Sequence, residues 1–122
     1  MTKGILLVSH VHALAEGVQK LLLEVAKDVP IATAAGLEDG GIGTSFEKIQ
    51  KVIAEHPADE ILAFYDLGSA KMNLEMAIEL SEKTIHLYDT AFVESAYTAA
   101  ALLEAQAELP AIEEQLDQMK IK

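Results

Sequence analysis

The sequence contains no cysteine, no arginine and no tryptophan. Without cysteine there is no disulfide bond and no thiolate ligand for a metal ion. A chain without disulfides fits a reducing compartment, so we expect a cytoplasmic protein. No apolar run approaches the roughly 20 residues that a membrane-spanning helix needs. The short apolar run near the N-terminus is typical of a strand, not of a signal peptide. We therefore expect no membrane association.

The missing arginine restricts what the protein can bind. All nine basic residues are lysines, and 20 acidic residues bring the net charge to −11. Nucleic acids bind basic surfaces, so we expect no nucleic-acid partner. Any phosphate group must be held without a guanidinium fork, by backbone N–H groups, hydroxyls, histidine or helix N-termini. Much of the acidic charge is most simply a solvated surface that favours solubility.

Hydrophobic residues make up 51% of the chain and aromatics only 5%, so the core must be aliphatic. Short apolar segments alternate with amphipathic ones, and this order predicts an α/β fold. The expected strands cover 5–8, 31–35, 60–65 and 84–88. The expected helices cover 11–27, a segment from Thr44 or Ser45 to Pro57, 70–81, a segment from Asp89 or Thr90 to 107, and a last helix opened by Pro110. We expect a single domain, 1–122, with a doubly wound, four-stranded parallel sheet of order 2-1-3-4, flanking helices and C-terminal helices.

The periodicity of large apolar residues predicts which helix faces pack on the sheet. In the first helix the predicted buried stripe consists of Leu14, Val18, Leu21, Leu22 and Val25. In the third helix it consists of Met72, Met76 and Leu80. Methionine also suits adaptable contacts with partners, but a position in the core is the expectation here.

Polar residues follow three of the strands, where sites of parallel sheets lie. Ser9 and His10 follow the first strand, a glycine-rich loop (36–43) leads from the second to Thr44 and Ser45, and 66–69 follow the third. With the first strand in the centre, these segments meet. Asp66 can then accept a hydrogen bond from Nδ1 of His10, which leaves Nε2 as a nucleophile. The residues expected to bind phosphate are Ser9, Gly43, Thr44, Gly68 and Ser69.

Other interpretations of these histidines and loops are weaker. His10 and His12 could be half of a metal site, but the segment that follows is helical in character, and His56 and His86 lie elsewhere. We therefore expect no metal, and we expect His12 to be an exposed first-turn residue. Residues 41–45 lack the lysine of a P-loop. A response-regulator receiver would need acidic residues where Ser9 and His10 stand, and a flavodoxin would need a hydroxyl-rich loop there.

Four segments together resemble a known family: VSHVHALAEGV (8–18), AAGLEDGGIGTS (34–45), DLGSAKMNLEMAIEL (66–80) and AFVESAYTAAALL (91–103). The chain resembles the phosphotransferase subunit of the phosphoenolpyruvate-dependent dihydroxyacetone kinase, a fold relative of the IIA domain of mannose-type sugar phosphotransferase systems. Val11 follows His10, where sugar-transport members commonly have glycine, so the dihydroxyacetone branch is favoured. The segment 90–95 departs from the proline and L-V-E-G of relatives.

The resemblance implies a specific function and a set of partners. It implies that His10 is the phosphorylated residue, that Asp66 orients it, and that Thr44, Gly68 and Ser69 lie beside the phosphate. The family's subunit is a cytoplasmic homodimer that takes phosphate from the phosphocarrier protein HPr. It passes the phosphate to ADP held on the ADP-binding subunit of the kinase, so that no cofactor is bound directly by this chain.

Two alternatives remain open on the sequence alone. The chain could be a sugar-transport IIA domain that phosphorylates a IIB partner, or a non-catalytic regulatory module on the same fold. The net charge of −11 also suggests that an acidic rim attracts the basic surface of a carrier or of the nucleotide-binding subunit and speeds their encounter.

Overall fold

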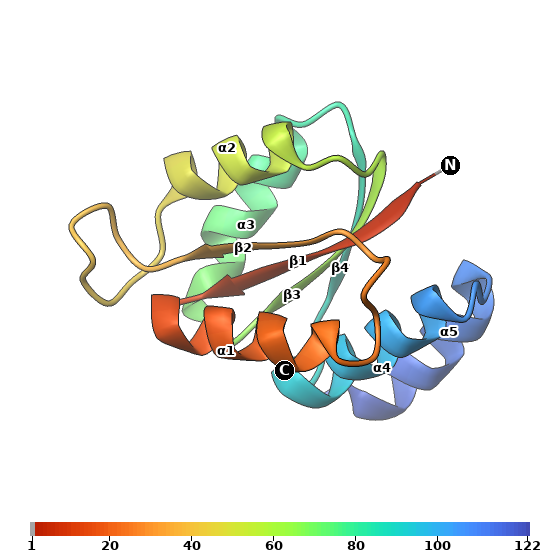
Figure 1. The fold of residues 1–122 in the computed structure, drawn as a ribbon. Coiled ribbons are helices and arrows are strands. Elements are labelled where there is room, and N and C mark those ends of the chain that lie inside the picture. Colours follow the sequence, from red (N-terminus) through yellow and green to blue (C-terminus); the bar gives the residue numbers. More distant parts are fainter. Residues whose placement is uncertain (1) are drawn as a thin grey trace.

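The computed structural model describes residues 2–122, so that Met1 of the expected domain lies outside the described residues. A parallel sheet of order β2-β1-β3-β4 lies between two layers of helices (Figure 1). The strands are β1 (Lys3–Ser9), β2 (Ile31–Ala35), β3 (Glu60–Tyr65) and β4 (Thr84–Tyr88). The helices are α1 (His12–Leu23), α2 (Phe46–Glu55), α3 (Ser69–Glu79), α4 (Phe92–Glu104) and α5 (Leu109–Leu116), followed by the 3-10 helix η1 (Asp117–Met119). The predicted fold class and strand order are confirmed.

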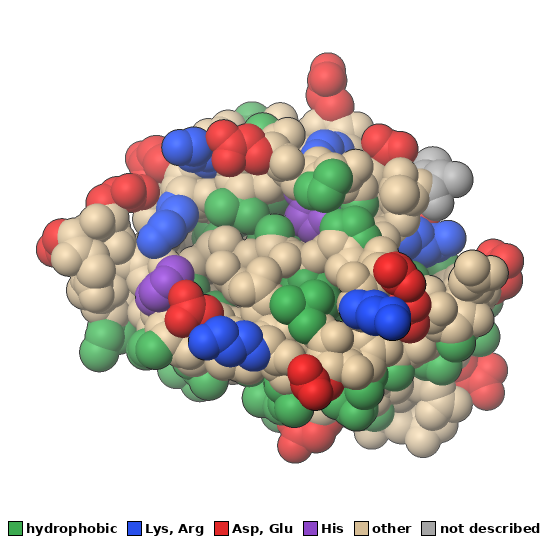
Figure 2. All heavy atoms as spheres, viewed as in Figure 1, with side chains coloured by type: hydrophobic (Ala, Val, Ile, Leu, Met, Phe, Trp, Pro, Cys, Tyr) green, Lys and Arg blue, Asp and Glu red, His purple; other side chains and the backbone are tan. Residues whose placement is uncertain are grey.

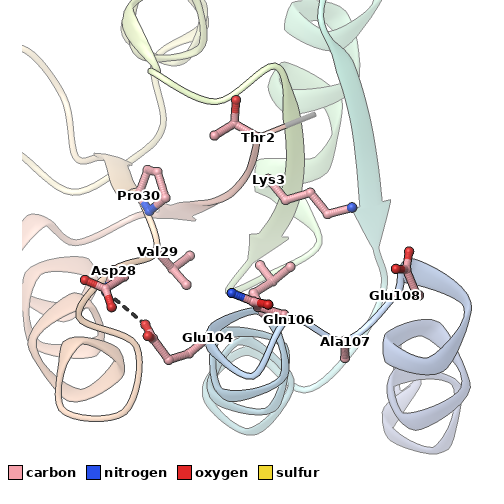
Figure 3. A pocket seen from close by; sticks show the side chains of 10 residues that line it. Thr2, Lys3, Asp28, Val29, Pro30, Glu104, Gln106, Ala107 and Glu108 are labelled. Atoms are coloured by element: carbon pink, nitrogen blue, oxygen red, sulfur yellow. Dashed lines mark hydrogen bonds between the residues drawn. The ribbon is translucent and has the colours of Figure 1, made fainter.

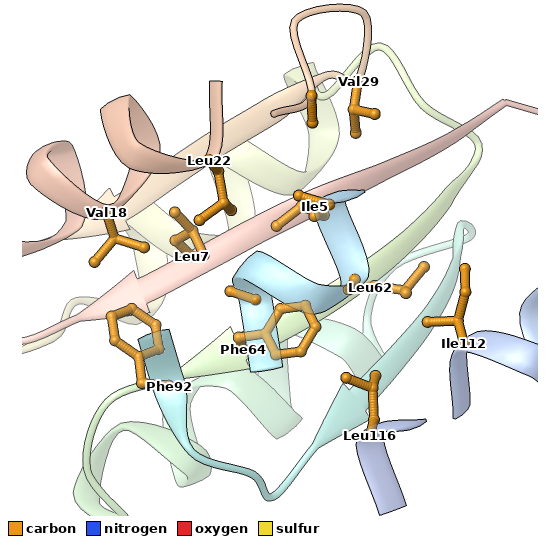
Figure 4. Close-up of a cluster of buried hydrophobic side chains, with 14 residues drawn as sticks. Ile5, Leu7, Val18, Leu22, Val29, Leu62, Phe64, Phe92, Ile112 and Leu116 are labelled. Carbon is orange, nitrogen blue, oxygen red and sulfur yellow. The ribbon is translucent and has the colours of Figure 1, made fainter. Parts of the chain in front are cut away.

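The aliphatic run of β1 supplies both halves of the core. Ile5 and Leu7 face α1, α4 and α5, whereas Leu6 and Val8 face α2 and α3, because successive side chains of a strand point to opposite faces. All four side chains are fully buried. Figure 4 shows the first half, where Ile5 and Leu7 lie near Val18 and Leu22 of α1 and near side chains of α4 and α5. Burial on both faces explains why this strand is continuously apolar.

The predicted buried faces of two helices are wrong in part. In α1, Leu14 and Leu21 are 42% and 45% exposed, and Ala15 lies in the core beside Val18 and Leu22. The helix also ends at Leu23 rather than at residue 27.

The error is larger in α3, where all three residues of the predicted stripe are exposed. Met72 is 71% exposed, and Met76 and Leu80 are also at the surface. Ala70, Leu74 and Ala77 are buried instead. Alanine lets a helix approach the sheet closely, so the buried face contains small side chains that a search for large apolar residues overlooks.

Of the predicted helix caps, the one of α2 is confirmed and the one of α4 is wrong. Ser45 caps α2, where its hydroxyl accepts a hydrogen bond from the backbone N–H of Lys48 at 3.2 Å. Neither Asp89 nor Thr90 caps α4, because the N-cap is Ala91 and no side chain caps it. The α4 helix ends at Glu104, before the predicted residue 107. Within residues 2–122, no helix combines the length and the apolar character needed to cross a bilayer.

Gly4 of β1 packs against a buried histidine. His56 is 5% exposed, and its Nε2 contacts the carbonyl oxygen of Ile5 at 3.0 Å. The backbone N–H of Ala58 donates to its Nδ1 at 3.1 Å. A Cβ atom at Gly4 would overlap Cε1 of this ring and lie 2.8 Å from the carbonyl oxygen of Pro30. Neither the hydrogen-bonded ring nor the backbone can move aside easily, so this position requires glycine.

We expect Gly4→Ala to lower the free energy of unfolding by about 2–3 kcal/mol, because overpacking a buried site costs this much. Gly17 is the matched control, since a Cβ there would meet no atom within 4 Å. It lies within α1, so Gly17→Ala should raise the free energy of unfolding by roughly 0.5–1 kcal/mol. Urea unfolding of both variants tests this pair. Equal stability of the two variants would contradict the packing argument.

Candidate functional site

The carboxyl ends of β1 and β3 bring His10 and Asp66 together. In the sheet register Val8 pairs with Tyr65, and the backbone N–H of Asp66 donates to the carbonyl of Val8 at 3.1 Å. The residues that follow the two strands therefore lie side by side, although 56 positions separate them. This edge of the sheet is the side toward which the glycine-rich loop projects, at the left of Figure 1.

Asp66 holds His10 at two points. Oδ1 of Asp66 lies 2.9 Å from Nδ1 of the His10 ring, and Oδ2 accepts the backbone N–H of His10 at 2.9 Å. The two side chains are 17% and 9% exposed. Because an ionised carboxylate can only accept hydrogen bonds, Nδ1 carries the ring proton of a neutral His10. The lone pair is then on Nε2, the ring atom turned away from Asp66.

Hydrogen bonds keep the Asp66 side chain ionised in spite of its burial. Burial alone raises the pKa of the carboxyl group, but four donors favour the charged form and bring the pKa below its ordinary value. The donors are the backbone N–H of His10, the ring of His10, the Ser9 hydroxyl and the backbone N–H of Leu67. The Asp66 carboxylate, which is charged at neutral pH, can stabilise a positive charge that develops on the His10 ring.

Ser69, the first residue of α3, contacts the nucleophilic side of the ring. Its hydroxyl lies 2.6 Å from Nε2 of His10 and can donate to the lone pair there. Gly68 precedes it as the N-cap, and the backbone N–H groups of Ala70 and Lys71 donate to the carbonyls of Leu67 and Gly68 at 2.9 and 3.0 Å. The positive end of the helix dipole favours an anion here. A group on Nε2 would therefore meet the start of α3 once the hydroxyl rotates aside.

Two of the predicted phosphate ligands, Ser9 and Gly43, make hydrogen bonds to other groups in this structure. The buried Ser9 hydroxyl donates to Oδ2 of Asp66 at 2.9 Å and accepts the backbone N–H of Val11 at 3.1 Å. It contacts the carboxylate of Asp66 rather than Nε2 of His10. The backbone N–H of Gly43 donates to the carbonyl of His10 at 2.9 Å. Both residues therefore make hydrogen bonds to the His10–Asp66 pair or its backbone, away from the predicted contact with phosphate.

Asn73 is a site residue that the sequence interpretation did not identify. Its side-chain amide donates to the Thr44 hydroxyl at 2.9 Å. Asn73 lies four residues after Ser69, on the same face of α3, so this bond ties the glycine-rich loop to the helix that contacts His10. The i, i+4 spacing of two polar residues at the start of a helix is the signal that could have identified it.

The other histidines lie outside the His10 site. His12 is exposed and contacts Glu16 at 3.3 Å, as expected of a first-turn residue. His56 is buried beside Gly4, and Nε2 of His86 lies 2.6 Å from Oε2 of Glu60. Among the described residues, no group of three or more potential ligand side chains could hold a metal ion.

A cavity of about 460 Å³ opens at the opposite end of the sheet. Figure 3 shows its lining, which comes from the start of β1 with Lys3, from the loop before β2 and from the turn between α4 and α5. The backbone N–H of Asp28 donates to Glu104 there at 2.9 Å. Because β1 runs from Lys3 to Ser9, this cavity is separate from the His10 site.

A family model described as the PTS system fructose IIA component, EIIA-man, matches residues 4–113. The chain belongs to this family. It is 48% identical over 122 residues to the PTS-dependent dihydroxyacetone kinase, phosphotransferase subunit DhaM of Lactococcus lactis subsp. lactis, covering 100% of this chain and 99% of the relative. It is 42% identical over 119 residues to the phosphoryl donor subunit DhaM of PEP-dependent dihydroxyacetone kinase 1 of Listeria innocua, covering 98% and 96%. The resemblance stated from the sequence is confirmed.

A solved structure supports the assignment of the fold. The crystal structure of EF1359, a protein described as of unknown function, superimposes with a TM-score of 0.87 at 30% sequence identity. The match covers 100% of this chain and 98% of that chain. The family fold thus extends over the whole described chain, and the segment 90–95 leads into a regular α4.

Proposed function

We propose that this chain is the phosphoryl donor subunit of a phosphoenolpyruvate-dependent dihydroxyacetone kinase. In this role His10 accepts a phosphoryl group from the phosphocarrier protein HPr and passes it to ADP held on the ADP-binding subunit of the kinase. The observation that carries the proposal is the pairing of Nδ1 of His10 with Asp66, which leaves the lone pair on Nε2, beside the Ser69 hydroxyl. Relatives with this printed role match nearly the whole chain.

The chemistry is a pair of displacements at phosphorus. The Nε2 lone pair of His10 attacks the phosphorus of the phosphorylated carrier, and the bond from phosphorus to the carrier breaks as the N–P bond forms. The ring gains positive charge, which Asp66 stabilises through Nδ1–H. A terminal oxygen of ADP then attacks the same phosphorus, the N–P bond breaks, and ATP leaves with the partner subunit. His10 returns to its neutral form.

The groups around Nε2 favour transfer in both directions. The Ser69 hydroxyl and the N-terminus of α3 can hold the phosphoryl oxygens, while the chain contains no arginine. Phosphoryl transfer depends mainly on positioning and on electrostatic stabilisation of the equatorial oxygens. Neutral hydrogen-bond donors stabilise the phosphorylated state less than a bidentate guanidinium group would, so the phosphate remains transferable.

Both partners must reach Nε2, and the surface beside it is apolar. Val11, Leu67 and Met72 flank the site segments and are 36%, 61% and 71% exposed. Figure 2 shows acidic side chains around the periphery of one face of the molecule, with lysines dispersed among them. We propose that HPr and the kinase subunit dock on this apolar surface. The net charge of −11 accelerates their encounter with this chain. We also propose that the chain works as a cytoplasmic homodimer.

The test is a phosphotransfer assay with phosphoenolpyruvate, enzyme I and HPr. We expect one acid-labile phosphate on the protein by intact mass, discharged when the ADP-loaded kinase subunit is added. A phosphoprotein that is stable toward that subunit but is discharged by a IIB protein would identify a sugar-transport IIA domain, the alternative favoured by the family description. A protein that accepts no phosphate would be a non-catalytic module. Transfer rates that do not change with salt concentration would contradict the electrostatic role of the acidic surface.

A further inference from the structure

The ammonium group of Lys122 lies against the backbone that carries Asp66. Its Nζ donates to the carbonyl of Tyr65 at 2.6 Å and to the carbonyl of Asp66 at 2.8 Å. It also lies 4.4 Å from the centre of the Tyr65 ring, on the ring face. Removal of the ammonium from water lowers the pKa of Lys122, while attraction to Asp66 and Asp89 opposes this shift. Lys122 has no contact with His10 in the described structure and lies 56 residues from Asp66 in the sequence.

Backbone pairing brings Lys122 to this position. Residues 117–122, here called the tail segment, consist of η1 and the three residues after it, and Lys120 forms an antiparallel bridge with Thr90, which follows β4. The backbone N–H of Ala91 donates to the carbonyl of Met119 at 2.9 Å, and that of Ile121 donates to the carbonyl of Asp89 at 3.3 Å. The tail segment thereby crosses the end of β4 and reaches the carboxyl end of β3.

The same region carries a second polar connection. The hydroxyl of Tyr65 donates to Asp89 at 2.6 Å, and Lys71 of α3 pairs with Asp89 at 3.0 Å. Asp89 follows β4 and also accepts the tail segment through its carbonyl. Asp89 therefore connects the end of β3, the first turns of α3 and the tail segment to one another near Asp66.

The two carbonyl groups that Lys122 contacts lie on either side of the Asp66 Cα atom, and this arrangement determines which part of the backbone Lys122 restrains. The carbonyl of Tyr65 belongs to the peptide unit before the Asp66 Cα atom, and the carbonyl of Asp66 belongs to the unit after it. One ammonium that binds both oxygens restrains both peptide planes and thus φ and ψ of Asp66. The direction of the Asp66 Cα–Cβ bond follows from these two angles, and so does the position of the carboxylate beside His10.

We propose that Lys122 is a positioning residue for the His10–Asp66 pair, acting through the backbone of Asp66. The proposal rests on the proposed function, because the pair is assigned there to phosphoryl transfer. Small displacements of a catalytic group lower rates steeply, roughly 100-fold for about 1 Å. We expect Lys122→Met, which keeps the length of the side chain without its charge, to lower the rate of phosphorylation of His10 by phosphorylated HPr roughly 10- to 100-fold.

Lys120→Met is the matched control. Lys120 lies in the same tail segment, its side chain is 65% exposed, and its ammonium pairs with Asp117 at 3.4 Å. Lys120→Met removes the same charge as Lys122→Met but breaks no contact to the Asp66 backbone. The rate at which this variant is phosphorylated should therefore stay within about twofold of wild type. An equal loss in the two variants would attribute the effect to net charge and overturn the proposal, as would a wild-type rate in Lys122→Met.

A spectroscopic readout separates this proposal from the proposed function. The ¹⁵N chemical shifts of the His10 ring in the unphosphorylated protein report which nitrogen carries the proton. Wild type and Lys120→Met should show the Nδ1–H form, and Lys122→Met should show a mixture of the two forms. Identical ring shifts in all three proteins would overturn the positioning role. If wild type itself accepts no phosphate, the proposed function fails, while the ring shifts still decide the role of Lys122.

Discussion

We expect His10→Ala to accept no measurable phosphate from phosphorylated HPr, a loss of more than about 10,000-fold, because removal of a covalent nucleophile eliminates the reaction path. Among the described residues, His10 is the histidine whose ring pairs with Asp66; its side chain is 17% exposed and its Nε2 faces the Ser69 hydroxyl. Intact mass spectrometry after incubation with phosphoenolpyruvate, enzyme I and HPr measures the label directly.

His12→Ala is the control for this variant. His12 is exposed and its ring pairs with Glu16 at 3.3 Å, so its loss should leave the label and its discharge unchanged. Thermal unfolding should show that His10→Ala is folded, with a Tm lowered modestly because one hydrogen bond to Asp66 is lost. If His10→Ala kept the label and His12→Ala lost it, His12 would be the phosphorylated residue. That outcome would reject the site described here.

The second large effect concerns Asp66→Asn, for which we expect a loss of roughly 100- to 10,000-fold in the transfer rate. An amide has one acceptor oxygen, whereas each carboxylate oxygen of Asp66 faces two donors. If the amide oxygen stays with Ser9 and the backbone N–H of His10, the NH₂ group faces Nδ1. The ring then carries its proton on Nε2, where the lone pair is needed. The same substitution in the histidine–aspartate pair of a serine protease lowers turnover about 10,000-fold through the wrong tautomer.

Stability gives an independent measurement of the same substitution. Loss of charge-assisted hydrogen bonds should lower the free energy of unfolding by about 2–3 kcal/mol at neutral pH. The pKa of Asp66 is lower in the folded protein than its ordinary value of 3.8, so its contribution is complete above pH 3.8 and is lost as the pH falls through the folded pKa. The stability difference between wild type and Asp66→Asn should therefore shrink in acid.

Asp28→Asn is the control, because Asp28 is exposed at the opposite end of the sheet. It removes the same charge and should change neither the transfer rate nor the acid dependence of stability. A wild-type transfer rate in Asp66→Asn would contradict the orienting role of Asp66. So would an acid-independent stability difference.

Local and topological features of the chain were sufficient to predict the architecture. The continuous run Ile5–Val8 identifies a strand buried on both faces, and Ser45 identifies the start of α2, because both signals depend on a few neighbouring residues. The proximity of His10 and Asp66 followed from one further rule, that polar residues after parallel strands gather at one edge of the sheet. The motifs of four segments then indicated the family.

The sequence by itself thus determined the fold class, the strand order, the family and the candidate His10–Asp66 pair. Only the tertiary structure decided which faces of α1 and α3 are buried, because Ala15, Ala70 and Ala77 pack closely without a strong hydrophobic signal. It also decided that Ser9 orients Asp66 and that Lys122 holds the Asp66 backbone. Each of these contacts joins residues more than 50 positions apart, and no local pattern encodes the meeting of two side chains that the packing of whole elements brings together.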